Sequence, residues 1–150
     1  MRAARLAAAL ALAVRATGGE GADTVYVTLQ ATTRNAGQIG RAFLLPEGGG
    51  SRIQVEVSGV PPMLSTRPVH LYTYLYAGRC DQRSAKPAFA LLDRVLAQTP
   101  SGTGGLRGPF TVSNTAPLPF ARLTAGPYAI VVRTSPADGS IDIFCGNVGR

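Results

Sequence analysis

Residues 68–80 read PVHLYTYLYAGRC, and the alternation of side chains in this stretch predicts a β-strand. One face of that strand would carry Val69, Leu71, Thr73 and Leu75, and the other would carry His70, Tyr72, Tyr74 and Tyr76. We expect the first face to pack in the core and the aromatic stripe to lie outside it, where tyrosine rings can make polar and apolar contacts. Two interpretations of the stripe stay open, namely packing under a loop or at a dimer interface, and binding of a ligand or partner.

The same period of two recurs along the chain. Val25, Val27 and Leu29 alternate with polar residues, and so does the segment 52–58. Further strands are expected at 38–45, 88–96, 109–114, 119–124, 127–133 and 140–145, of which 88–96 could instead be a helix, and the glycine-rich stretch 98–109 is expected to be a loop. Many short strands separated by Gly and Pro indicate a β-sandwich or β-barrel, here a single domain over residues 23–150.

Composition excludes several classes of protein. The chain has 150 residues, of which 45% are hydrophobic and 15% charged, and it contains one His and two Cys. One copy of this chain therefore cannot build a zinc finger or a metal site with two histidines. The charged fraction is also too low for a disordered polyelectrolyte.

The N-terminus has the pattern of a secretory leader. Arginines precede the apolar run Leu6–Val14, which is too short to span a bilayer. We interpret residues 1–22 as a signal peptide cleaved somewhere between Ala16 and Ala22, with an uncleaved N-terminal helix as the alternative. Loss of residues 1–16 removes three arginines and lowers the formal net charge from +7 to +4. The mature protein is then periplasmic or secreted in a bacterium, without a transmembrane segment, and its charge does not favour nucleic-acid binding.

The two cysteines agree with export. Cys80 and Cys145 lie far apart in the chain and lack the close spacing of metal or redox pairs. In an oxidising compartment they would most simply form one disulfide, and two separate core thiols are the alternative.

Several motifs together resemble the copper/zinc superoxide dismutase fold family. CGNVG at 145–149 is similar to the closing Cys-Gly-x-x-Gly of that family, and GPYAIVVR at 126–133 is similar to its penultimate strand. HLY at 70–72 sits where the family has His-x-His ahead of its disulfide cysteine, and VSGVPP at 57–62 resembles its strand-then-turn segment. The resemblance implies a Greek-key β-barrel of about eight strands with a Cys80–Cys145 bridge.

The departures from the family concern its metal site. Of the copper-ligand positions only His70 keeps a histidine, because Tyr72 and Arg133 stand in the places of two others, and no second histidine exists for the zinc loop. Asp142 stands where the family has its active-site arginine. Copper redox cycling needs several imidazoles, and arginine is permanently cationic. We therefore expect a degenerate member with no catalytic residues, no metal and no cofactor.

The function that follows is a non-catalytic binding or interaction module. Its ligand, an unknown small molecule or an envelope protein, would lie on the face bearing His70, Tyr72, Tyr74, Tyr76 and Arg133. The basic residues Arg79, Arg83 and Lys86 around Cys80 form either a solvated loop or a site for an anion or acidic partner. The alternative is a residual copper-binding protein or a dismutase-type metalloenzyme that uses His70 and is completed in an oligomer. A homodimer formed through the tyrosine stripe is a third option.

Overall fold

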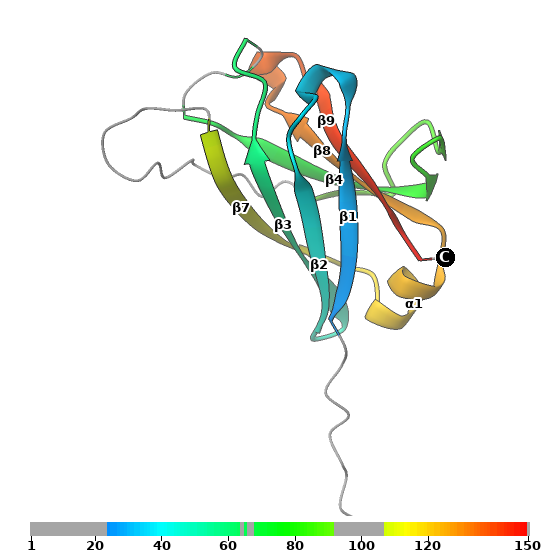
Figure 1. Ribbon diagram of the computed structural model, residues 1–150. Coiled ribbons are helices and arrows are strands. Elements are labelled where there is room, and N and C mark those ends of the chain that lie inside the picture. Colours follow the sequence, from blue (N-terminus) through cyan, green and yellow to red (C-terminus); the bar gives the residue numbers. More distant parts are fainter. Residues whose placement is uncertain (1–23, 64, 66–67, 92–106, 150) are drawn as a thin grey trace, which may run out of the picture.

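The computed structural model describes residues 24–63, 65, 68–91 and 107–149, and in these residues nine β-strands form one antiparallel sheet that curls round a core (Figure 1). The strands are β1 (Val25–Ala31), β2 (Gly40–Glu47), β3 (Gly50–Gly59), β4 (Leu71–Arg79), β5 (Gln82–Arg83), β6 (Phe89–Leu91), β7 (Arg107–Ala116), β8 (Tyr128–Thr134) and β9 (Asp142–Val148). One helical turn, α1 (Phe120–Ala125), and two 3₁₀ turns, η1 (Thr33–Asn35) and η2 (Pro136–Asp138), complete the described elements. The prediction of an all-β chain is confirmed.

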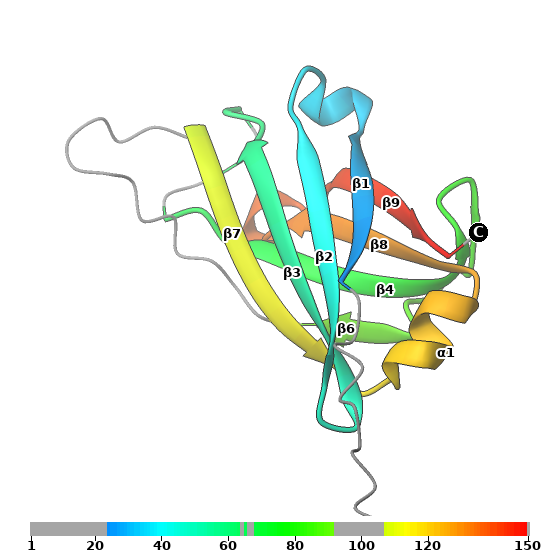
Figure 2. The ribbon, with the colours of Figure 1, turned by 60° about the horizontal axis from the view of Figure 1, so that its bottom comes forward.

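The strands lie in the order β5-β4-β8-β9-β1-β2-β3-β7, and β6 pairs with β4. β1, β2, β3 and β7 form one layer, and β6, β4, β8 and β9 form the other, which crosses behind it (Figure 2). β6 also contacts β7, so these strands lie in the spatial order β8-β4-β6-β7. β8, the last of the four along the chain, therefore lies beside β4, the first. This spatial order is that of a Greek key, the arrangement that the resemblance implies.

The core lies between the two layers. Ile53 and Val55 of β3 and Leu75 of β4 have no exposed surface, as the alternation predicts. Thr73 is also fully buried, and its hydroxyl oxygen accepts a hydrogen bond of 3.2 Å from the Asn114 amide of β7. This bond satisfies polar atoms inside the core and connects one layer to the other.

The strand expected at 119–124 is wrong, because α1 occupies this segment. The Pro119 carbonyl accepts hydrogen bonds from the amides of Arg122 and Leu123, which closes a single turn. Leu123 is fully buried, and α1 contacts β2 and β3 at one end of the sheet. None of the helices in the described part of the chain has the length and apolar character needed to cross a membrane.

Two other predicted segments are only partly described. Of the segment 88–96, residues Phe89–Leu91 form β6, and residues 92–96 lie outside the described residues. Of the loop expected at 98–109, residues 107–109 belong to β7, so this part of the loop prediction is wrong, and the rest lies outside the described residues. Extension of β7 over Arg107–Ala116 follows from its long pairing with β3.

The predicted disulfide is confirmed. Cys80, just after β4, is bonded to Cys145 in β9, with Cα atoms 6.0 Å apart and a sequence separation of 65. The amide of Cys80 also donates a 2.7 Å hydrogen bond to the side-chain oxygen of Asn147. In the chain-entropy model a loop of this length makes the disulfide worth roughly 4 kcal/mol.

The two layers join where β9 lies against β1. The pairing covers Gln30 with Cys145 and Ala31 with Phe144. Gly146 follows directly, and a Cβ added to it would come within 2.6 Å of both the Leu29 side chain and the Thr28 carbonyl oxygen. Only glycine therefore permits this close approach of the two strands.

Replacing Gly146→Ala is expected to lower the free energy of unfolding by about 2 kcal/mol, since the new methyl group must push against the backbone of β1. Urea unfolding followed by circular dichroism measures the change. Gly49→Ala is the matched control, because a Cβ at Gly49 meets nothing within 4 Å. Equal stability of the two variants would contradict this account of the junction.

Candidate functional site

The tyrosine stripe of β4 faces away from the core and lies beside β8. Across this pair of strands Tyr72 is opposite Arg133, and Tyr74 is opposite Val131. The Arg133 guanidinium carbon lies 4.7 Å from the centre of the Tyr74 ring and 5.5 Å from that of Tyr76. These distances are those of cation–π contacts, which are strongest where water is partly excluded.

Asp142 reaches this face because β9 contains an irregularity. Val132 pairs with Phe144 but Arg133 pairs with Asp142, so Ile143 is an extra residue. Ile143 and Phe144 are both fully buried in the core. Simple alternation would have turned Asp142 inward, and the extra residue turns it outward beside Arg133.

The Asp142 carboxylate binds two arginines. One oxygen accepts a hydrogen bond from Arg133 Nε, and the other accepts one from Arg83 Nη2 of β5. The Arg83 guanidinium carbon also lies 4.8 Å from the centre of the Tyr76 ring. We call Tyr74, Tyr76, Arg83, Arg133 and Asp142 the arginine–tyrosine cluster.

The cluster is partly shielded from solvent. The side chains of Arg133, Asp142 and Arg83 are 21%, 22% and 28% exposed, and Tyr76 is buried at 2%. Tyr76 packs with Ala129, Val131 and the disulfide in a small apolar cluster on the outer side of the sheet. Tyr76 is thus buried within the layer itself, whereas Tyr72 and Tyr74 are half-buried, and both interpretations of the stripe stay predictions.

Ion pairing sets the charges in the cluster. Burial acts to raise the pKa of Asp142, but the hydrogen bonds from Arg133 and Arg83 outweigh it and hold that pKa below its usual value. Burial is likewise the largest single influence on Arg133 and acts to lower its pKa, but the hydrogen bond to Asp142, the Asp142 charge and Tyr76 together outweigh it and raise that pKa. At neutral pH two guanidinium cations therefore share one carboxylate, which leaves one positive charge in excess.

This arrangement does not fit a copper ion. Of the positions that resemble the copper ligands, Arg133 places a cation among the tyrosine rings, where it would repel a metal. His70 is half-buried just before β4, and within the described part of the chain no hydrogen bond, ion pair or ring contact joins it to the cluster. The described residues also contain no group of three or more His, Cys, Asp or Glu side chains placed to hold a metal.

Of the predicted site residues, the structure brings Tyr74, Tyr76 and Arg133 into contact and places Tyr72 opposite Arg133. Asp142 was not among them, because the extra residue in β9 reverses its direction. The sequence predicts Arg83 only as a member of a basic group, whose other members, Arg79 and Lys86, are exposed. The signal that the sequence offers for Asp142 is the resemblance, in which it stands at the position of the family's active-site arginine.

No family model, curated protein or solved structure matches this chain. The resemblance to the superoxide dismutase fold family thus remains a prediction that rests on the motifs and their order.

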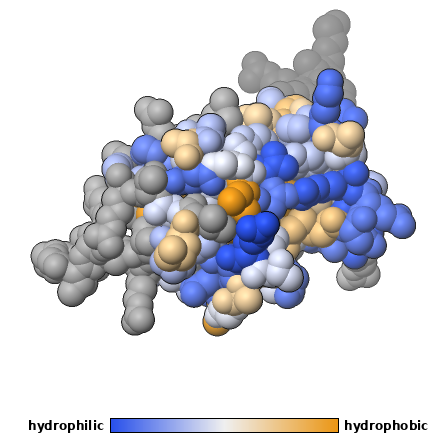
Figure 3. All heavy atoms as spheres, turned by 90° about the horizontal axis from the view of Figure 1, so that it is seen from above, coloured by the Kyte–Doolittle hydropathy of each residue, from blue (hydrophilic) through white to orange (hydrophobic). Residues whose placement is uncertain are grey.

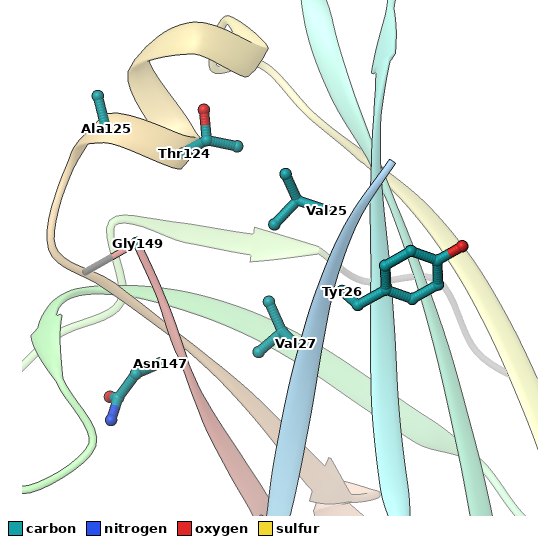
Figure 4. Close-up of a pocket in the computed structure, with 7 residues that line it drawn as sticks. All are labelled: Val25, Tyr26, Val27, Thr124, Ala125, Asn147 and Gly149. Carbon is teal, nitrogen blue, oxygen red and sulfur yellow. The ribbon is translucent and has the colours of Figure 1, made fainter. Parts of the chain in front are cut away.

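A separate open depression of about 560 Å³ lies where β1 and β9 diverge, next to the end of α1 (Figure 4). Its lining residues are Val25, Tyr26, Val27, Thr124, Ala125, Asn147 and Gly149. Val25 and Val27 point into it, whereas the ring of Tyr26 points to the other side of β1 (Figure 4). The lining offers apolar surface without a charged side chain, so we assign no chemistry to it.

Asp142→Asn is expected to destabilise the protein by about 1–2 kcal/mol at pH 7, because two half-buried guanidiniums lose their carboxylate. The carboxyl pKa is lower in the folded than in the unfolded chain, so this stabilisation is fully present above the unfolded value near 3.9. It is lost as the pH falls below that value and through the lower folded pKa. Urea unfolding between pH 7 and pH 2 should therefore show wild type and variant converging in acid.

The control for this measurement is Asp81→Asn, since Asp81 is exposed and makes no ion pair with any described residue. Its stability should follow that of the wild type at every pH. A gap between wild type and Asp142→Asn that stayed constant down to pH 2 would rule out the ion pairs as its cause.

Proposed function

We propose that this chain is an exported, non-catalytic binding module that holds a small anion, or an aromatic ligand bearing a negative charge, at the arginine–tyrosine cluster. In this proposal the superoxide dismutase-like fold has lost its metal site, and dismutase activity is absent. The observation that carries it is the sharing of one carboxylate, Asp142, by Arg83 and Arg133.

The excess positive charge supports an anionic ligand. Both oxygens of Asp142 are already hydrogen-bonded, one to each arginine, so the carboxylate is fully used within the cluster. The remaining positive charge belongs to Arg133 and Arg83, whose side chains are only 21% and 28% exposed. At such partly buried positions the effective dielectric constant is lower than in water. An anion arriving from solvent would therefore gain more from this cation than from an exposed lysine.

The tyrosines support a ligand with a flat apolar part. Tyr72 and Tyr74 are half-buried on the same face as Arg133, and Arg133 already lies over the ring of Tyr74. A ring that carries a carboxylate could place its charge near Arg133 and its apolar edge on the tyrosines.

Export is supported by two observations of different kind. The disulfide Cys80–Cys145 is a bond that persists in oxidising compartments. The leader-like residues 1–22 agree with it at the level of sequence.

Thermal unfolding in the presence of benzoate, 4-hydroxybenzoate, citrate or phosphate tests the proposal. At least one of these anions should raise the Tm of the wild type, and a concentration 100 times the Kd would add about 2.7 kcal/mol to the free energy of unfolding. The double variant Tyr74→Ala, Arg133→Ala should lose that rise because it removes both the cation and the ring that supports it. Arg122→Ala, a change of an exposed arginine on α1, is the control and should keep the rise.

A double variant that responds to the anion as the wild type does would place the binding site elsewhere. Metal analysis of untagged protein purified from the periplasm tests the competing copper function. Stoichiometric copper that survives dialysis would overturn the proposal in favour of a copper-binding protein that uses His70.

A further inference from the structure

The outer face of β1, β2, β3 and β7 is distinct from the arginine–tyrosine cluster and lies on the other layer. No described helix or strand covers it (Figure 1). Tyr26 of β1 and Phe43 of β2 are cross-strand partners on this face, with ring centroids 5.3 Å apart in an edge-to-face arrangement. Tyr26 is 72% exposed, so most of one aromatic ring is presented to solvent.

The charged side chains of this face are paired with one another. Arg41 and Glu56 form an ion pair at 2.7 Å, and Arg52 is paired with Glu47. The Arg41 guanidinium also lies over the Phe43 ring at 5.2 Å. Two arginines thus balance two glutamates, and the described side chains of this face carry no net charge.

Uncharged polar groups and paired charged groups lie beside the two rings. Tyr26, Phe43, Gln54 and Ser113 form one row across the four strands, and Thr28, Arg41, Glu56 and Thr111 form the next. Since neighbouring strands lie about 4.8 Å apart, a row of four strands spans about 14 Å. The face therefore combines an exposed ring with hydroxyl, amide and paired charged groups over the length of a short run of linked sugar rings.

We propose that this face binds a neutral polysaccharide. The apolar C–H side of a sugar ring would stack on Tyr26, and the sugar hydroxyls would exchange hydrogen bonds with Gln54 and with the Arg41–Glu56 pair. The balance of charge among the described side chains of this face argues against an acidic or basic partner, which would need an unpaired charge opposite its own. A second copy of the chain is also disfavoured, because a stable dimer buries about 800 Å² per partner. Among the described residues, the strongly exposed large apolar side chains here are only Tyr26 in β1 and Ile39 just before β2.

Native electrophoresis through gels containing hydroxyethyl cellulose, glucomannan or dextran tests this inference. The wild type should be retarded in at least one of these neutral gels, and Tyr26→Ala should bind at least about fivefold more weakly because a stacking contact is lost. Gln54→Ala provides a second variant that leaves the rings in place and should also weaken retention. Met63→Ala, which removes an apolar side chain that is 91% exposed and lies outside the strands, is the matched control and should migrate as the wild type does.

Three results would overturn the inference. The first is equal migration of the wild type with and without each neutral polysaccharide, and the second is undiminished retention of Tyr26→Ala. The third is self-association in sedimentation velocity that Tyr26→Ala abolishes, which would make the face a contact between copies of this chain. Because the anion response of the Tyr74→Ala, Arg133→Ala variant is measured separately, failure of one proposal leaves the other intact.

Discussion

The fold depends on the double pairing of β9, which forms hydrogen bonds with β1 on one side and with β8 on the other. Within the described residues this is the ladder that makes a single curled sheet of the two layers. Gly146 permits the close approach to β1, and the neighbouring Cys145 fixes the same strand covalently to the end of β4. The extra residue Ile143 then turns Asp142 outward. One short strand thus sets the closure of the sheet and the composition of its outer face.

The arginine–tyrosine cluster is a consequence of that strand rather than an addition to it. Arg133 is brought to the tyrosines by the β4–β8 register, and Arg83 is brought to Tyr76 by the short β5 hairpin beside the disulfide. Asp142 couples the two cations, so the effect of changing either arginine depends on the presence of the other. Each arginine contacts both Asp142 and a tyrosine ring, so replacing one arginine changes the charge and the ring contacts of the cluster together.

Much of the fold could be predicted from side-chain alternation. The two faces predicted for 68–80 match the observed burial of Leu71, Thr73 and Leu75, and the disulfide was expected from the cysteines and the resemblance. The helical turn α1 was not predicted, because its formation depends on Leu123 filling the end of the sheet, a tertiary contact. Asp142 was missed for a related reason, since an extra residue in a strand leaves no mark in a pattern of period two.

The divergence of β1 and β9 has a consequence for attachment. Val25 and Gly149 line the same depression, so the described chain begins and ends at one end of the molecule. The opposite end, where β9 begins, shows a mainly hydrophilic surface with separate apolar spots (Figure 3). Attachments made at residues 24 and 149 would therefore lie near one another. An attachment at residue 149 would lie close to the β4–β5 hairpin, because Asn147 is hydrogen-bonded to Cys80, whereas one at residue 24 would continue β1.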